Sequence, residues 1–388
     1  MFSSRFHWDF NQNRLTQLLA EKRRASVSIL DLTESNPTHA GLVYPSDMMR
    51  AFDNARAFDY SPAPAGTPGG RLAVAAYYEA RGSQVAAERI LLTASTSEAY
   101  AYLFKLLANP GDNVLVPRPS YPLFDYLATM ESIEVRQYPL TYHGAWGIDM
   151  EGVVAAIDER TRAIVVVHPN NPTGSYVKRA ELDALVELCR ERELALISDE
   201  VFSDYDFSPD HHRAGSVADV KDCLAFAMSG LSKIAGLPQM KLGWIVAGGP
   251  PALRAEAFEK LEWIADTYLS VSTPVQWAAE SLLQAGEQVQ MQIRERCATH
   301  LSQAREALAG SAANILAVEG GWYITLQVPR VRSEEEWTLE LLERENVLVQ
   351  PGFFYDFDSE AYLVVSLLTA PEIFSEGIAR LRRQFDGA

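Results

Sequence analysis

The sequence predicts an α/β protein in which a mostly parallel seven-stranded sheet with helices on both faces forms a large domain, and a smaller α+β domain follows. The first observation is a series of seven apolar runs of strand length between residues 90 and 247, with stretches of helical period between several of them. This alternation is typical of βαβ units and a parallel sheet. The second is a change after about residue 255, where long helical stretches precede two strands and a closing helix.

The seven predicted strands are almost entirely apolar, which indicates strands buried on both faces. They occupy residues 90–93, 113–116, 133–138, 163–168, 195–198, 223–228 and 243–247. Residues 97–107 and 179–193 have the apolar spacing of helices. The order of strand and helix therefore predicts parallel strands joined by helical crossovers.

The second half of the chain begins with a helical stretch from about residue 255 that runs past Trp277, and another follows from Gly286 to Ala309. We expect the long helix to connect two domains. Strands are predicted at residues 322–328 and 362–368, and a closing helix at residues 374–385.

The N-terminal segment fits neither pattern, and residues 5–24 have the character of an arm or a first helix. We therefore predict three parts. Residues 1–44 form an N-terminal arm that packs with the small domain, residues 45–275 form the large domain, and residues 276–388 form the small C-terminal domain.

The composition excludes several classes of protein. The chain has 388 residues, of which 48% are hydrophobic and 22% are charged, as expected of a globular protein with a large core. Its net charge of −17 repels phosphate backbones and anionic lipid surfaces, so neither nucleic acid nor membrane is an expected partner. No run approaches the roughly twenty apolar residues of a membrane span. His7 and Asp9 lie where a signal peptide would be apolar. We expect a cytoplasmic protein.

The three cysteines, Cys189, Cys223 and Cys297, are widely separated and odd in number. They form neither a disulfide framework nor a metal-ligand pair, and reduced thiols in the core are expected. No metal site is predicted.

In a parallel sheet, the side chains that follow the strands gather at the carboxyl edge, so chemistry is expected at the strand exits. The strand at 223–228 is followed by Ser229-Gly230-Leu231-Ser232-Lys233, and Lys241 returns a second cation to that edge. A lysine amine in a dry pocket or beside another cation loses its proton and can attack a carbonyl, forming a Schiff base. By itself, a lysine on a turn is more often an ordinary surface residue.

Three other strand exits carry polar groups. Asp199 ends one strand, where its carboxylate must have a neutralising partner or a shifted pKa, and a protonated ring nitrogen would be a suitable partner. A helix N-cap or a salt-bridged acid explains the residue as well. Asn171 presents an amide from a proline-rich loop, which is also a well-formed turn. Ser95, Thr96 and Ser97 open a helix, whose free N–H groups attract phosphate, although helix capping explains the hydroxyl groups equally well.

The order and spacing of these groups resemble the class I/II aminotransferase family of fold type I pyridoxal-phosphate enzymes. The resemblance is carried by Tyr60, Ser95-Thr96-Ser97, Tyr121, Asn171-Pro172-Thr173-Gly174, Asp199, Ser232-Lys233 and Lys241-Leu242-Gly243. It extends from Glu34-Ser35-Asn36-Pro37 to the Pro351-Gly352 turn and the closing helix. It implies a transaminase that uses pyridoxal 5'-phosphate to move an amino group between an amino acid and a 2-oxo acid by a ping-pong mechanism, and it makes residues 45–275 the cofactor-binding domain.

The resemblance also assigns roles to residues. Lys233 would hold the cofactor as an imine and carry the substrate proton, and Asp199 would keep the ring nitrogen protonated, so that the ring accepts electrons. Asn171 would bind the phenolic oxygen and Tyr121 would stack on the ring. Thr96, Ser97, Ser232 and Lys241 would hold the phosphate, with Ser95 beside them. Tyr60 would reach the phosphate of the neighbouring subunit, which implies a homodimer with shared active sites.

Three positions depart from the family pattern. Lys241 replaces an arginine, so it keeps the charge but loses the planar fork. Phe202 replaces a tyrosine whose hydroxyl also binds the phenolic oxygen. Val364, in Val364-Val365-Ser366, replaces the arginine that grips the substrate carboxylate. Either another cation takes this role or the substrate is not an ordinary α-amino acid. Arg118, Arg5 and Lys178 are the candidate cations.

The small domain has aromatic residues in two segments, 320–323 and 351–355, which either line the substrate pocket and favour an apolar substrate or belong to the core. Two other functions stay open. Because Val364 and Phe202 help to decide which substrate bond aligns with the ring, a lyase, decarboxylase or oxidase acting on an amino acid is the first alternative. The second is a catalytically silent binding protein that keeps the fold.

Overall fold

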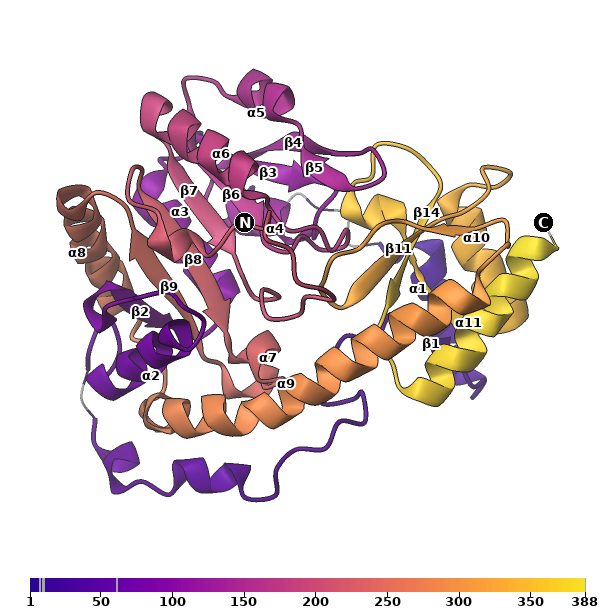
Figure 1. The fold of residues 1–388 in the computed structure, drawn as a ribbon, viewed down its shortest axis with the longest axis horizontal. Coiled ribbons are helices and arrows are strands. Elements are labelled where there is room, and N and C mark those ends of the chain that lie inside the picture. The colour runs from indigo at the N-terminus through magenta and orange to yellow at the C-terminus, as the bar shows by residue number, and fades with distance from the viewer. Residues whose placement is uncertain (7, 9–10, 61, 388) are drawn as a thin grey trace.

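The computed structural model describes residues 1–6, 8, 11–60 and 62–387 and contains a large eight-stranded sheet, a small four-stranded sheet and the helices around them (Figure 1). His7 and Asp9, on which the signal-peptide argument rests, lie outside the described residues. None of the helices in the described part of the chain combines the length and apolar character that a membrane span requires.

The large sheet contains all seven predicted strands. In spatial order they are β2 (Ile90–Thr93), β9 (Gly243–Gly248), β8 (Ala225–Gly230), β7 (Ala195–Asp199), β6 (Thr161–Val167), β3 (Asn113–Arg118) and β4 (Glu134–Tyr142), followed by β5 (Trp146–Ile148). The sheet therefore has one strand more than predicted. β5 forms an antiparallel hairpin with β4, and three residues are too few for a recognisable apolar run. β9 is antiparallel to both of its neighbours, and the other pairs from β8 to β4 are parallel.

Helices cover both faces of this sheet, as predicted. Alternate residues of each strand point to opposite sides, so the apolar strands pack against a helix layer on each face. Ala195 and Ile197 of β7 pack in the core beneath α3 (Thr96–Leu107), α4 (Leu123–Met130) and α8 (Pro251–Tyr268). Leu196 packs on the opposite face with α2 (Pro68–Glu79), α5 (Met150–Ala156) and α6 (Arg179–Arg192). By the same alternation, Asp199 faces α3.

The long helical region differs from the prediction. α8 ends at Tyr268, and a single 35-residue helix, α9 (Thr273–Ala307), continues through Gly286 (Figure 1). The break lies at residues 269–272, where Leu269 has a left-handed φ of 44° and Pro274 allows a new helix to begin. Gly286 does not start a helix; it allows α9 to pack closely on α7 (Leu231–Ile234) and the residue after it.

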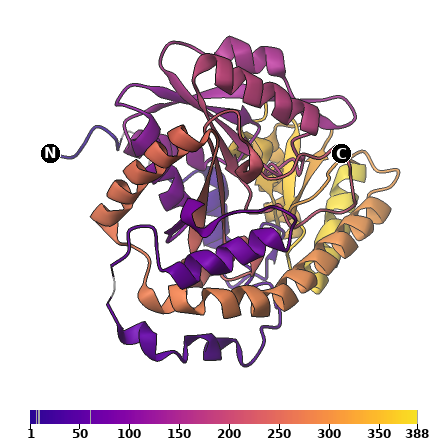
Figure 2. The same cartoon turned by 60° about the vertical axis from the view of Figure 1, so that its left-hand side comes forward.

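The smaller sheet is antiparallel, with the order β10 (Asn314–Ile315), β11 (Tyr323–Gln327), β14 (Tyr362–Ser366) and β13 (Gln350–Pro351). α9 reaches from α2 and α7 to the closing helix α11 (Pro371–Asp386), so it contacts elements near both sheets (Figures 1 and 2). The predicted strands at 322–328 and 362–368 and the closing helix are therefore present.

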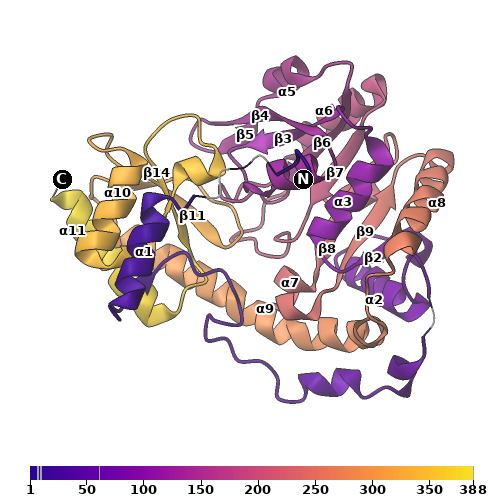
Figure 3. The same ribbon diagram turned by 180° about the vertical axis from the view of Figure 1, so that it is seen from behind.

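The N-terminal segment forms α1 (Arg14–Arg24) and β1 (Leu30–Asp31). α1 lies against α10 (Glu334–Glu340), as Figure 3 shows, and β1 pairs in parallel with β12 (Val347–Leu348). The domain boundaries at residues 44/45 and 275/276 stay a prediction.

Several short helical segments connect these elements. They are the 3₁₀ segments Met48–Phe52, Ala55–Phe58, Ala87–Arg89, Val217–Asp219, Pro238–Met240 and Gly352–Tyr355, and the π segment Leu341–Glu345.

Candidate active site

The strand pairing brings the predicted strand exits to one edge of the large sheet. Asp199, at the end of β7, lies between Val167 of β6 and Met228 of β8. Gly230, at the end of β8, is paired with Gly243 at the start of β9, and Gly243 is also paired with Thr93 at the end of β2. The segments that follow β2, β7 and β8 and the segment that precedes β9 therefore lie at the same edge of the sheet.

Lys233 lies on α7, directly after β8. The backbone N–H of Leu231 donates to the carbonyl of Leu242 at 2.9 Å, and the hydroxyl of Tyr205 donates to the carbonyl of Lys233 at 2.5 Å. A Cβ on Gly230 would lie 2.9 Å from the Cα of Gly243, so glycine is required where the two strand ends meet. These contacts fix the backbone from which the lysine projects.

The amine of Lys233 lies among aromatic rings. Its Nζ is 4.9 Å from the ring centroid of Trp322 and 5.6 Å from that of Phe202. Burial lowers the pKa of Lys233 to about 8, and the Asp199 carboxylate acts in the opposite direction. About one tenth of the amine is therefore uncharged at pH 7, far more than for an ordinary lysine, and the uncharged form is the one that attacks a carbonyl.

The carboxylate of Asp199 receives hydrogen bonds on both oxygens. The Val201 N–H donates to Oδ1 and the Tyr100 hydroxyl donates to Oδ2, each at 3.2 Å. Burial raises the pKa of Asp199 to about 6, while these hydrogen bonds and the Lys233 charge lower it. Within the described residues, Asp199 forms no ion pair, although the Lys233 charge acts on it, so a cationic ligand would stabilise its charged form.

Asn171 contributes a buried amide whose Oδ1 has no hydrogen-bond partner in the described structure. The neighbouring Asn170 differs, since its Nδ2 donates to Pro119 and Thr173 and its Oδ1 accepts from Ser120. Asn170 therefore stabilises the loop, and Asn171 is the amide left for a ligand.

The segment Ser95-Thr96-Ser97 begins α3, a twelve-residue helix. The Ser95 hydroxyl accepts from the Glu98 N–H at 3.2 Å, so the helix-capping interpretation holds for this residue. A Cβ on Gly243 would lie 3.2 Å from the carbonyl carbon of Ser95, which places the Lys241–Gly243 turn beside the start of α3. Lys241 forms no ion pair within the described residues. Together with Ser232, these groups can hold an anion.

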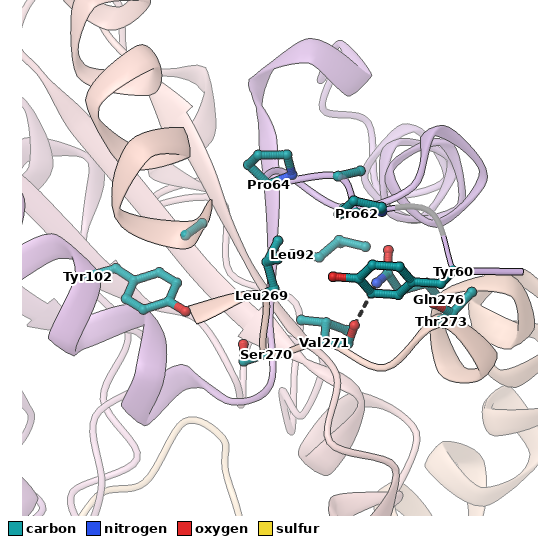
Figure 4. A pocket seen from close by; sticks show the side chains of 13 residues that line it. Tyr60, Pro62, Pro64, Leu92, Tyr102, Leu269, Ser270, Val271, Thr273 and Gln276 are labelled. Atoms are coloured by element: carbon teal, nitrogen blue, oxygen red, sulfur yellow. Dashed lines mark hydrogen bonds between the residues drawn. The ribbon is translucent and has the colours of Figure 1, made fainter. Parts of the chain in front are cut away.

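The two aromatic residues of the predicted site, Tyr121 and Tyr60, lie in different parts of the structure. Tyr121 is 48% exposed. Burial raises the pKa of Tyr323 to about 12 and the pKa of Tyr355 well above its usual value, and the nearby Tyr121 phenol adds to both shifts. Tyr60 is 79% exposed and lines a small cavity of about 40 Å³ beside the turn between α8 and α9 (Figure 4). Neither Lys233 nor Asp199 lines this cavity.

Val364 is buried in β14 opposite Thr325 of β11, so this position itself supplies no positive charge. Arg118 pairs with Asp358 at 2.6 Å, and Lys178 pairs with Glu319 at 2.5 Å. Arg5 donates to Ser132, just before β4 begins and thus at the opposite edge of the sheet. All three candidate cations are engaged elsewhere.

Sequence reasoning missed Tyr100 as a contact of the site and gave Trp322 no contact with Lys233. Tyr100 donates to Asp199, and Trp322 packs on the Lys233 amine. The sequence indicates Trp322 only as a pocket wall or a core residue. Tyr100 carries one available signal, a polar-tipped side chain on the buried face of the helix that begins at the serine-rich turn.

Comparison with known proteins gives consistent results. Residues 27–373 match the family described as aminotransferase class I and II. The chain is 27% identical over 370 residues to glutamate-pyruvate aminotransferase AlaA of Haemophilus influenzae, covering 92% of this chain and 90% of that protein. It is 26% identical over 369 residues to the tyrosine aminotransferase of Mus musculus, covering 91% and 79%. The structure of alanine aminotransferase from Pyrococcus furiosus has a TM-score of 0.88 at 24% identity and covers 100% of both chains.

Proposed function

The chain belongs to the class I and II aminotransferase family, and from this premise we propose how its own residues move an amino group between an amino acid and a 2-oxo acid. The protein is a transaminase that depends on pyridoxal 5'-phosphate. The roles of individual residues, the assembly and the substrate class are the proposal.

The residues present fit this cofactor. Four features of the site match four groups of the cofactor. A half-buried carboxylate without an ion-pair partner, an unpartnered buried amide, an amine with a lowered pKa and a helix start beside an unpaired lysine match a ring nitrogen, a phenolic oxygen, an aldehyde and a phosphate. Asp199, Asn171 and Lys233 would hold the first three. Thr96, Ser97, Ser232 and Lys241 would hold the phosphate, with Ser95 beside them as the helix cap.

When bound, the cofactor supplies a carbonyl carbon and an electron-accepting ring. Lys233 would hold that carbon through its Nζ, and the same amine would take the proton from the substrate Cα. Its lowered pKa suits this task, because a general base works best with a pKa near the working pH. One amine serves both halves of a ping-pong cycle.

Asp199 would stabilise the positive charge on the ring nitrogen, and Tyr121 would cover the ring. Phe202 has no hydroxyl, so Asn171 is the side chain proposed for the phenolic oxygen. The single observation that carries the proposal is the placement of the Lys233 amine and the Asp199 carboxylate at one buried edge of the sheet, each with a pKa shifted towards neutrality.

The lining favours an amino donor with an apolar side chain. Phe202, Trp322 and Tyr323 pack together beside Lys233, and Val364 adds no charge. The Trp322 Nε1 is a buried donor without a partner in the described structure, so it is a neutral group available to a substrate. The tyrosine aminotransferase of Mus musculus and the alanine aminotransferase of Pyrococcus furiosus are named for amino acids of this class, whereas the Haemophilus influenzae relative is named for glutamate and pyruvate.

We also propose a homodimer with shared active sites. Tyr60 is 79% exposed and Phe58 is 93% exposed, so this segment presents aromatic surface that a second copy would cover. Tyr60 would then reach the phosphate of the partner subunit. A cytoplasmic location stays a prediction.

A single-turnover assay tests the reaction. Loaded enzyme is mixed with alanine, tyrosine or aspartate without an acceptor, and we expect one equivalent of 2-oxo acid per site from the apolar donors. The first alternative, a lyase, decarboxylase or oxidase, is favoured by Val364 and Phe202. Continuous release of ammonia, carbon dioxide or peroxide would support that alternative and contradict transamination.

A further inference from the structure

The carboxylate of Asp199 is held by one main-chain donor and one side-chain donor. The Val201 N–H contacts Oδ1 and the Tyr100 hydroxyl contacts Oδ2, each at 3.2 Å. Tyr100 is the single side chain that donates to Asp199 within the described residues. The main-chain contact is set by the turn after β7, so Tyr100 is the donor that a substitution can remove.

The phenol of Tyr100 has little freedom to move. The residue is 3% exposed, and its ring packs edge-on against Phe124 at 5.5 Å and is tilted against Phe104 at 5.7 Å. A buried phenol needs a hydrogen-bond partner, and the Asp199 carboxylate supplies it. Burial and the nearby Asp199 charge raise the pKa of Tyr100 well above its usual value, so it stays protonated as a donor.

We propose that Tyr100 is a positioning residue for Asp199, which fixes the orientation of the carboxylate and favours its charged form. A hydrogen bond to a carboxylate stabilises the ionised state. This inference rests on the proposed role of Asp199 as the partner of the cofactor ring nitrogen.

Several titratable groups surround this pair. Lys233 faces Asp199 from α7, Glu200 is its chain neighbour, and Tyr138 lies near Tyr100. Loss of the Tyr100 hydroxyl removes one interaction that lowers the pKa of Asp199. The acid limb of cofactor binding should therefore move to higher pH.

The test is an equilibrium titration of cofactor-free protein with pyridoxal 5'-phosphate between pH 5 and 9, followed by protein fluorescence. For Tyr100→Phe we expect affinity at neutral pH to fall about tenfold and the acid limb to rise by about one pH unit. Tyr138→Phe is the matched control, because its buried hydroxyl donates to the Val165 carbonyl at 2.8 Å and does not contact Asp199. It should change affinity less than about twofold.

A double-mutant cycle separates positioning from general loss of packing. If Tyr100 acts through the Asp199 charge, Tyr100→Phe should have little effect on affinity in an Asp199→Asn background. Equal effects in both backgrounds, or an unchanged acid limb in Tyr100→Phe, would overturn the inference. Circular dichroism establishes that each variant is folded.

The same series distinguishes this inference from the proposed function. If Asp199→Asn loses affinity while Tyr100→Phe matches wild type, the role of Asp199 stands and that of Tyr100 fails. If Asp199→Asn binds the cofactor like wild type, the proposed role of Asp199 itself is wrong.

Discussion

Ala235, two residues after Lys233, lies directly against Gly286 in the middle of α9. A Cβ on Gly286 would be 2.4 Å from the Ala235 Cβ, closer than two carbon atoms can approach. The helix that joins the regions of the two sheets therefore supports the short helix that carries the amine.

Gly286→Ala should destabilise the protein by about 1–3 kcal/mol despite the better helix propensity of alanine, because the new methyl group overpacks this contact. It should also reduce kcat/KM by displacing Lys233. Urea unfolding and steady-state kinetics measure the two effects. Adding Ala235→Gly should partly restore both, and a Gly286→Ala variant as stable as wild type would contradict the contact.

Lys233→Met should abolish turnover and make the cofactor-free protein more stable. The folded-state pKa of Lys233, about 8, lies below its unfolded value of 10.5, so the charged amine opposes folding below pH 8 and this effect fades as pH rises towards 10.5. We expect a gain on the order of 1–3 kcal/mol at pH 7 and a smaller gain at pH 10. Urea unfolding at both pH values measures it, and equal stability at pH 7 would refute the buried charge.

Glu200→Gln should raise the free energy of unfolding, relative to wild type, more at pH 8 than at pH 5. Burial raises the folded pKa of Glu200 from 4.5 to about 7, so the stability present at low pH is lost as pH rises through this interval. The uncharged amide avoids that loss, on the order of 1–3 kcal/mol, and urea unfolding at the two pH values measures it. Glu259→Gln, at an exposed position on α8, is the control. A pH-independent difference between Glu200→Gln and wild type would contradict this account.

Hybrid dimers test the shared active site. If Tyr60 acts across the interface, a dimer of one Lys233→Ala chain and one Tyr60→Ala chain contains one intact site and should have about half the wild-type activity. Differently tagged chains allow the hybrid to be purified. Activity no higher than that of the Tyr60→Ala homodimer would show that Tyr60 acts elsewhere.

The sequence was sufficient for seven of the eight strands of the large sheet and for the edge at which Lys233 and Asp199 lie, because buried parallel strands have a strong apolar pattern and their exits are polar. The sequence was insufficient where contacts between distant segments determine the role of a residue. In the sequence, Gly286 has the pattern of a helix boundary. The reason for the glycine is its contact with Ala235, which lies in a distant segment of the chain and leaves no local pattern. Tyr100 has the pattern of a core residue because its partner lies 99 positions away.

The most direct test of the account is to load the protein with pyridoxal 5'-phosphate, reduce it with borohydride and map the peptides by mass spectrometry. We predict the mass of the reduced cofactor on the peptide that contains Lys233, at about one per chain, and its loss in Lys233→Met. A cofactor mass on Lys241 or another lysine, with Lys233 unmodified, would contradict the central claim.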